Sequence, residues 1–181
     1  MRPDPLHQVQ SPWSSSSLAL RSLLWTLVLP GFFAGYVPWR FFGLSRAAIS
    51  WSNPAHLLGL VCIGLGVVLL GACIVEFART GRGTLSPVDP PRRLVVRGLY
   101  RHVRNPMYLS VTTIVLGEGL LTRTWALSVY WAIWFLSANL FVIGYEESAL
   151  RRRFGASYDE YTKQAGRWFP NLRSRRPPRH R

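Results

Sequence analysis

The sequence predicts an all-α polytopic membrane protein with about four transmembrane helices, the last two forming a hairpin, and a cytoplasmic C-terminal helical tail. Hydrophobic residues make up 49% of the 181 residues, yet the net charge is +14. The two kinds of residue are separated along the chain: apolar segments at residues 18–42, 55–78, 107–121 and 125–145 alternate with arginine-rich connections. Apolar runs of about 20 residues flanked by basic loops are typical of membrane-spanning helices.

The chain begins with a polar segment followed by an apolar one. Residues 1–17 are rich in serine, contain proline and show no periodicity, so they are predicted to be disordered. Residues 18–42 resemble a signal peptide at their start, but the apolar run continues past Pro30 without a convincing small-residue cleavage site. We therefore expect this segment to be retained, so that residues 18–78 hold two transmembrane helices.

The second apolar segment, residues 55–78, has the length of a spanning helix and is rich in small residues, namely Gly59, Gly64, Gly66, Gly71 and Ala72. Small residues let helices approach closely in lipid, which predicts a central position for this helix. Cys62 and Cys73 also fall within it and are interpreted as small apolar packing residues. No cysteine spacing typical of zinc or of a disulfide is present, and no metal site is predicted.

The connection between the second and third segments is predicted to be an irregular surface turn. It opens with Gly81-Arg82-Gly83 and continues through several prolines, which exclude a regular helix. The Gly-x-Gly sequence is a weak signal for phosphate binding, because the strand that a dinucleotide fold needs before it is missing. Asn105 and Pro106 then favour a helix N-cap and a first helical turn.

The third apolar segment, residues 107–121, is short for a spanning helix. Two interpretations remain open. Leu99 and Tyr100 extend it to a full span, or it forms a tight hairpin with the fourth segment around residues 122–124.

The fourth segment is predicted to continue beyond residue 145 to Arg153 or Phe154, where Gly155 ends the helix. Residues 157–160 match the Ser-x-x-Glu capping box, which predicts a further short helix that ends at Gly166. Three aromatic residues fall at helical spacing here, and they form either an apolar stripe on the membrane interface or part of an adenine pocket: Phe154, Tyr158 and Tyr161. Residues 171–181 are predicted to be a basic disordered tail.

The distribution of arginine predicts the orientation. Arginines gather in residues 79–105 and after residue 150, whereas the other two connections hold few. Basic loops stay on the cytoplasmic side, so four spans with both termini in the cytoplasm satisfy every loop. Arginine far outnumbers lysine, a bias that suggests a bacterial genome and hence the bacterial inner membrane. The charge needs no nucleic-acid partner, because no such motif is present and contact with anionic membrane lipids accounts for it.

Four carboxylates lie within or beside the apolar segments: Glu76, Glu118, Glu146 and Glu147. Charged groups there cost free energy, so each is a candidate functional residue. Glu118 is expected to reach water at the outer end of its helix, and Glu76 to pair with a nearby arginine. Glu147 stands four residues before Arg151, an order that favours an ion pair. Glu146 points about 100° away on the helix and is left over, which favours a cation site.

An anion site is predicted at the same depth. Arg101, Arg104 and the free backbone N–H groups of the helix that Asn105 caps combine positive charge with the positive end of the helix dipole. A zwitterionic ligand fits between this anion site and the two carboxylates.

These residues resemble the signature of the isoprenylcysteine carboxyl methyltransferase and phospholipid N-methyltransferase group of integral membrane enzymes. The resemblance covers about residues 98–170 and consists of Arg104-Asn105-Pro106-Met107-Tyr108, Glu146-Glu147 with Leu150, Phe154-Gly155, Tyr158, Tyr161 and Arg167-Trp168-Phe169-Pro170. Asn105 stands where many members have histidine. Asparagine does not titrate near neutral pH, so this position is not expected to be a general base.

The resemblance implies a catalytic region over residues 79–170 that binds S-adenosylmethionine as methyl donor. The implied cofactor-binding residues are Arg104, Asn105, Tyr108, Glu146, Glu147 and Tyr158. It further implies that Arg167 orients a carboxylate of the acceptor, although a contact with a lipid head group is an equal alternative. The acceptor would be a lipophilic small molecule or lipid-anchored substrate: a prenylated thiol-carboxylate, a phospholipid amine or a small thiol.

Two other function classes are considered. Membrane sterol-type reductases that use NADPH have a similar Arg-x-Pro-x-Tyr pattern, but the Glu146-Glu147 pair and the Phe-Gly-x-x-Tyr-x-x-Tyr spacing favour a methyltransferase. A non-catalytic membrane scaffold or lipid-binding protein would use the basic tail as its working part.

Overall fold

The structure is a computed structural model that describes residues 28–44, 49–76, 79 and 94–171. Within these residues the chain is helical and has no strand, apart from one isolated parallel bridge between Val103 and Gly166. The all-α prediction is therefore confirmed for this part of the chain. The predictions for residues 1–17, for the start of the first apolar segment, for the turn at residues 80–93 and for the tail from residue 172 lie outside the described residues.

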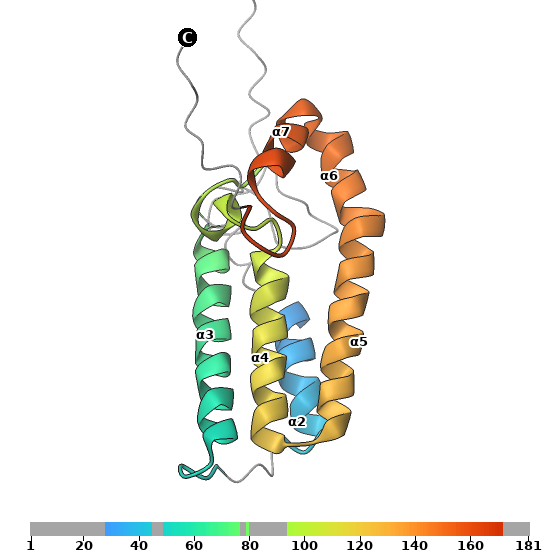
Figure 1. The fold of residues 1–181 in the computed structure, drawn as a ribbon. Helices are drawn as coiled ribbons and strands as arrows, with labels where there is room; N and C mark the ends of the chain where they lie inside the picture. Colours follow the sequence, from blue (N-terminus) through green and yellow to red (C-terminus); the bar gives the residue numbers. More distant parts are fainter. Residues whose placement is uncertain (1–27, 45–48, 77–78, 80–93, 172–181) are drawn as a thin grey trace, which may run out of the picture.

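The helices form an antiparallel bundle with a short cap at one end (Figure 1). A first helical segment runs from Val28 through η1 (Phe32–Tyr36) and α2 (Val37–Phe41). The bundle continues with α3 (Pro54–Glu76), α4 (Pro106–Thr122) and α5 (Trp125–Phe141). The π-helical turn η5 (Val142–Glu146) joins α5 without a break to α6 (Glu147–Phe154). The cap consists of the 3-10 turn η4 (Gly98–Arg101), α7 (Ala156–Gln164) and the segment after it.

Two helices in the described part of the chain are long and apolar enough to cross a membrane: Pro54–Glu76, with 23 residues, and Trp125–Phe154, with 30 residues. Only 17% of each apolar window is buried inside the protein, so these helices are not the core of a water-soluble fold. Large apolar side chains are exposed along both helices, among them Leu58, Val61, Val68, Ile133, Leu136 and Leu140. An apolar surface of this kind fits a lipid environment.

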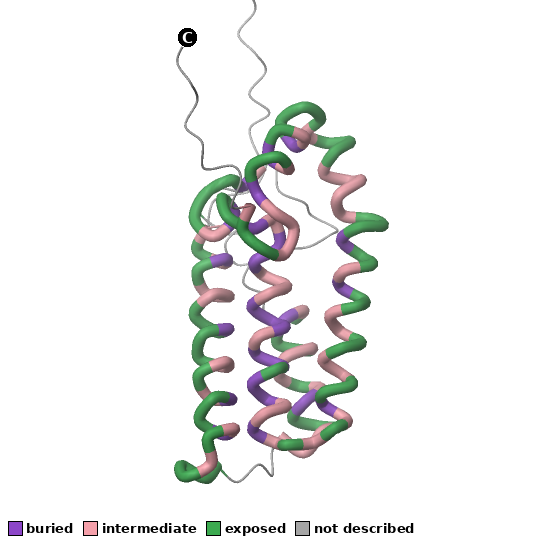
Figure 2. Tube along the Cα trace, viewed as in Figure 1, coloured by how far each residue is buried: buried purple, intermediate pink, exposed green. Residues whose placement is uncertain are grey.

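The central helix is α4, which lies between α3 and α5 (Figure 1) and contacts both as well as η1. Half of its length is buried, as Figure 2 shows by the purple positions on this helix. The prediction that the second apolar segment is central is therefore wrong. That segment is α3. Its glycines Gly59 and Gly66 pack against α4, whereas the opposite face of the helix is exposed.

Close packing of α3 on α4 depends on three glycines. A Cβ atom on Gly59 would lie 2.7 Å from the carbonyl oxygen of Gly117, and one on Gly66 would lie 2.8 Å from that of Ser110. A Cβ on Gly117 would in turn approach the Gly59 carbonyl oxygen to 2.5 Å. Gly64 of α3 has nothing within 4 Å of such an atom. Only the glycines that face α4 therefore determine how closely the helices approach.

The hairpin between the last two apolar segments is confirmed. α4 ends at Thr122, and Arg123 reverses the chain with a left-handed backbone, φ 52°. α5 begins two residues later, at Trp125. Leu99 and Tyr100 do not extend α4, because they belong to the separate turn η4 and a non-helical stretch separates them from Pro106.

The predicted helix end at Gly155 is also confirmed. α6 ends at Phe154, and Gly155 has φ 51° and ψ −129°, a conformation that other residues rarely adopt. The predicted capping box is wrong, since α7 already begins at Ala156 and has no side-chain cap. Gly155 turns the chain so sharply that the next residue starts the helix.

Glu118 does not reach water as expected. The residue is only 3% exposed, and its Oε2 atom is buried without a hydrogen-bond partner. Because α4 is the central helix, positions near its outer end are still enclosed by neighbouring helices.

Candidate functional site

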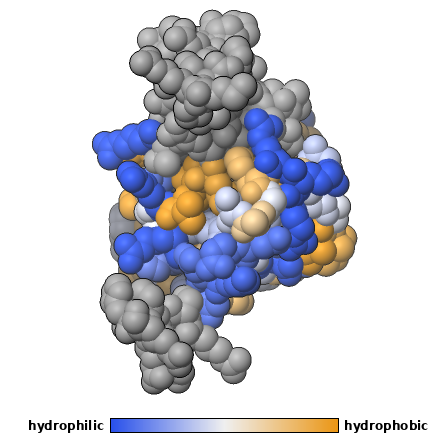
Figure 3. Space-filling view, turned by 90° about the horizontal axis from the view of Figure 1, so that it is seen from above, coloured by the Kyte–Doolittle hydropathy of each residue, from blue (hydrophilic) through white to orange (hydrophobic). Residues whose placement is uncertain are grey.

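The predicted site residues gather at the end of the bundle where α4 begins and α5 passes into α6 (Figure 1). Seen from this end, hydrophilic residues surround an apolar area, while undescribed residues cover part of the view (Figure 3). Residues 166–169, called the strap below, connect α7 to this site. The bridge between Gly166 and Val103 lays the strap along the segment that leads into α4.

Glycine is required at the start of the strap. The backbone N–H of Arg104 donates to the carbonyl oxygen of Gly166 over 2.8 Å, so the two segments are in direct contact. A Cβ atom on Gly166 would collide with the carbonyl oxygen of Phe169. The strap can therefore turn back on itself only with glycine here.

Glu147 lies between two guanidinium groups. Arg167 donates to it twice, from Nε to Oε1 over 2.6 Å and from Nη2 to Oε2 over 2.9 Å. Nη1 of Arg104 lies 3.2 Å from Oε1, and the Glu147 side chain is 14% exposed. The predicted ion pair between Glu147 and Arg151 is wrong, because Arg151 instead binds Asp159 of α7 over 2.8 Å. The hydrogen bonds to Glu147 raise the pKa of Arg167, which stays charged.

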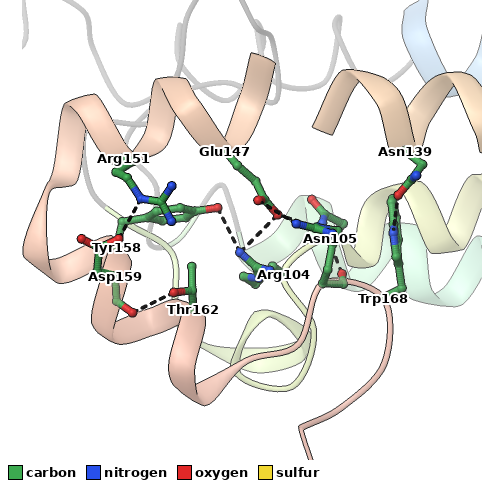
Figure 4. A network of polar contacts seen from close by, with 10 residues as sticks. Arg104, Asn105, Asn139, Glu147, Arg151, Tyr158, Asp159, Thr162 and Trp168 are labelled. Carbon is green, nitrogen blue, oxygen red and sulfur yellow. Dashed lines mark hydrogen bonds and ion pairs between the residues drawn. The ribbon is translucent and has the colours of Figure 1, made fainter. Parts of the chain in front are cut away.

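Arg104 connects Glu147 to the cap (Figure 4). Its Nη1 atom also donates to the hydroxyl oxygen of Tyr158 over 3.4 Å, a long bond. Burial raises the pKa of the Tyr158 hydroxyl, and the charge of Arg104 partly opposes this. The Arg104 side chain is 12% exposed, and its Nε atom is buried without a hydrogen-bond partner. A buried donor of a charged group that lacks an acceptor costs at least about 1–3 kcal/mol, so this atom is suited to meet an acceptor from a ligand.

Glu146 has a different environment from Glu147. Its Oε2 atom accepts one hydrogen bond from the Tyr108 hydroxyl over 3.0 Å. No arginine or lysine forms an ion pair with Glu146 in the described part of the chain. The π-helical turn η5 ends at Glu146, and such turns are frequent at functional sites. Among the described residues, one carboxylate of the pair is thus neutralised by two arginines, while the other has only a neutral donor.

Asn105 occupies the predicted N-cap position, but its side chain does not cap the helix. Its Nδ2 atom donates instead to the carbonyl oxygen of Arg167 over 3.2 Å, which fixes the strap (Figure 4). Asn105 is buried. This residue therefore positions the strap over the start of α4.

Sequence reasoning missed the contact between Asn139 and Trp168. The indole Nε1 of Trp168 donates to Oδ1 of Asn139 over 2.9 Å (Figure 4). The Trp168 ring lies edge-on to Tyr108, with 6.3 Å between centroids, and 5.3 Å from the Phe135 ring. The available signal was an amide side chain inside an apolar segment, which is costly in lipid.

The three aromatic residues at helical spacing form a small core with their neighbours. Tyr158 and Tyr161 are buried against Ala165, and Phe154 packs on them together with Leu150 and Leu94. The Tyr161 hydroxyl donates to the carbonyl oxygen of Tyr100 over 2.6 Å. The alternative of a stripe on the membrane interface is therefore wrong, because the two tyrosines face the inside of the cap.

The structure brings the predicted site residues together in two connected groups. Arg104, Asn105, Glu147, Tyr158 and Arg167 form one polar network, and Tyr108 with Glu146 forms a pair beside it. Trp168 contacts Tyr108 and so joins the groups. The described residues contain no group of three or more His, Cys, Asp or Glu that could hold a metal ion.

A protein-family model described as phospholipid methyltransferase matches residues 54–157. The matched range runs from the start of α3 to the beginning of α7 and contains both carboxylates and the start of α4. It ends just before Tyr158 and the strap. No curated protein matches the chain.

Proposed function

The chain belongs to the phospholipid methyltransferase family of integral membrane methyltransferases, and on this premise we propose that it transfers a methyl group from S-adenosylmethionine to a lipophilic acceptor. The observation that carries the donor assignment is the separation of charge at the site. A buried arginine with an open donor lies on one side, and a carboxylate without an ion pair lies on the other. The amino-acid end of S-adenosylmethionine has the complementary groups.

We assign the donor's α-carboxylate to Arg104 and the adjoining start of α4. Nε of Arg104 lacks an acceptor, and the first backbone N–H groups of a helix attract anions. The Tyr158 hydroxyl accepts a hydrogen bond from Arg104 and so helps to hold its guanidinium in place. Asn105 and Tyr108 border the same helix start and complete the donor side.

We assign the donor's α-ammonium group or its ribose hydroxyls to Glu146. A carboxylate with one hydrogen bond retains free lone pairs for such donors. Glu147 contributes differently, because both of its oxygens already accept hydrogen bonds from Arg167. Its role is to keep Arg104 and Arg167 side by side despite their like charges.

S-adenosylmethionine supplies an electrophilic methyl group on a sulfonium, so the protein needs to bind and orient two substrates and to exclude water. The low exposure of Arg104 and Glu147 and the strap above them support such a role. Arg167 is 35% exposed, which leaves it accessible for an anionic group of the acceptor. If the acceptor is an amine, it must lose a proton before or during transfer; both Glu147 oxygens already accept hydrogen bonds from Arg167, which leaves water as the proton acceptor.

The membrane arrangement is also part of the proposal. Four spans with both termini in the cytoplasm of a bacterial cell would place the site at the inner face of the inner membrane. The polar residues around the site end and the arginines of α6 support this orientation (Figure 3). The acceptor would then enter from the bilayer.

The donor assignment is tested by equilibrium binding of labelled S-adenosylmethionine to the purified protein in detergent. Glu146→Gln and Arg104→Gln should each weaken binding at least about tenfold, since each removes one charged contact worth about 1.5–3 kcal/mol. Glu160→Gln, at an exposed position on α7, is the matched control and should bind like the wild type. Wild-type protein that does not bind the donor would refute the proposal, and binding indifferent to both site variants would refute the residue assignment.

A further inference from the structure

Asn139 is an amide side chain in the largely apolar helix α5. It lies on α5 between Ala138 and Leu140, seven positions before Glu146. At ~1.5 Å per residue this is about 10 Å deeper in the membrane than the carboxylate pair. A polar group at that depth costs free energy unless it is paired, and such residues in membrane helices usually have a function.

The partner of Asn139 comes from the strap. Trp168 donates its indole N–H to Oδ1 of Asn139 over 2.9 Å, and its ring is wedged beside Tyr108 and Phe135. Tyr108 is the residue that hydrogen-bonds Glu146. Trp168 thus reaches from the cap into the space between α4 and α5, next to the proposed donor site.

Three consecutive strap residues are each held by a different hydrogen bond. The carbonyl oxygen of Gly166 binds the Arg104 amide, the carbonyl oxygen of Arg167 binds Asn105, and the indole of Trp168 binds Asn139. The first two bonds come from the start of α4. The third comes from Asn139 of α5 (Figure 4). Arg167, which lies between Gly166 and Trp168 in the sequence, reaches Glu147 of α6 with its guanidinium.

We propose that Asn139 is a positioning residue for the methyl transfer, acting through Trp168 to hold the strap so that Arg167 stays on Glu147. The effect on the reaction rests on the proposed function, whereas the anchoring of the strap does not. Without the Asn139 contact, the strap keeps its bonds to the start of α4 and the Arg167–Glu147 pair, while Trp168 is held against α5 by ring contacts alone. Arg167 is then held less rigidly in the position from which it orients the acceptor.

The anchoring is measured by hydrogen–deuterium exchange with mass spectrometry on the whole protein in detergent. The reporters are the Arg104 amide, which is bonded to Gly166, and the peptides that cover the strap. Asn139→Leu removes the acceptor at similar volume, and Trp168→Phe removes the donor but keeps a ring. Each should accelerate exchange about tenfold, the loss expected for one buried hydrogen bond, and the double variant should be no faster than the faster single variant.

Methyl transfer to a lipid extract provides the second measurement. Asn139→Leu should lower kcat about tenfold while the donor Kd stays within about threefold, because the donor contacts at Arg104 and Glu146 are retained. Ser137→Ala, an exposed position on the same helix, is the matched control and should change neither exchange nor kcat. A leucine in an apolar helix is compatible with folding, and thermal unfolding of each variant verifies this.

Unchanged exchange in both single variants, or additive effects in the double variant, would overturn the anchoring. Faster exchange with an unchanged kcat would overturn the positioning role. If the wild type neither binds the donor nor transfers methyl groups, the proposed function fails together with that role. The exchange data would still decide separately whether Asn139 anchors the strap.

Discussion

Neighbouring residues in this protein have very different electrostatic surroundings. Glu146 and Glu147 are adjacent, but Glu147 is held by Arg104 and Arg167, whereas Glu146 accepts a hydrogen bond from neutral Tyr108. A third cation brought to Glu147 would have to compete with two guanidinium groups. Of the two carboxylates, Glu146 therefore has the free lone pairs that the proposed contact with the donor's ammonium group needs.

Glu118 provides a test at the level of one residue. Its carboxyl group is buried in the bundle with an oxygen that lacks a partner. Glu118→Leu should stabilise the protein by about 1–3 kcal/mol, because it removes an unpaired polar group and preserves the volume. The apparent midpoint of thermal unfolding in detergent should rise by about 2–4 °C per kcal/mol for a chain of this length.

Glu118→Gln is the control for this prediction. Glutamine keeps a buried polar group without a partner, so it should give less stabilisation than leucine. A leucine variant that is less stable than the wild type would contradict the prediction. Such a result would mean that the Glu118 carboxyl group has a stabilising partner in the membrane, such as a lipid head group or a water molecule.

Among the elements, the pairing of α3 with α4 depends on backbone contact at glycine. Gly59→Ala places a methyl group 2.7 Å from the carbonyl oxygen of Gly117, a backbone atom that cannot rotate away. The helices must separate, at a cost of about 1–3 kcal/mol. Thermal unfolding of the variant in detergent should show a correspondingly lower apparent midpoint.

Gly64→Ala is the matched control on the same helix. Nothing lies within 4 Å of its added methyl group, so the variant should be as stable as the wild type or gain up to about 1 kcal/mol from helix propensity. Equal losses at both positions would contradict the role of close approach. In that case glycine would matter for the flexibility of α3 rather than for its contact with α4.

The extent of the helices was largely predictable from the sequence, because it depends on local signals. The apolar run predicted α3 nearly to its ends, Pro106 predicted the start of α4, and Gly155 predicted the end of α6. These residues act through their own backbone or through their immediate neighbours. Ser157 failed as a cap because the conformation of Gly155 decided the start of α7 first.

The partners of the site residues were less predictable, because they are distant in sequence. The motif identified Arg104, Glu147 and Arg167, but not that both arginines bind the same carboxylate. The predicted ion pair between Glu147 and Arg151 failed because Asp159, which the turn at Gly155 brings close, binds Arg151 instead. The bond from Trp168 to Asn139 spans 29 positions and leaves no periodic pattern.

At the scale of the whole molecule, the fold has two chemically distinct ends. One end holds the site and the basic helix α6, and the other holds the α4–α5 turn together with exposed Trp51 and Trp125. Tryptophan is enriched at membrane interfaces. The proposed orientation therefore places this turn on the outer face and α7 in the cytoplasm.

Cysteine labelling tests this orientation. Thr124→Cys at the turn and Lys163→Cys on α7 are introduced separately after Cys62 and Cys73 have been replaced by alanine. In intact bacterial cells a membrane-impermeant maleimide should label Thr124→Cys and leave Lys163→Cys unlabelled. The reverse pattern would overturn the orientation, and labelling of both positions only after lysis would place the turn inside as well.

The strap has a further consequence for the order in which the protein is made. Synthesis runs from the N-terminus at ~5–20 residues per second, so α4, α5 and both carboxylates leave the ribosome before residues 166–169 do. Until then the Arg104 amide and Asn139 lack the partners that they have in the finished structure. A growing chain that already lies in the bilayer therefore lacks the strap side of the site until residues 166–169 have been made.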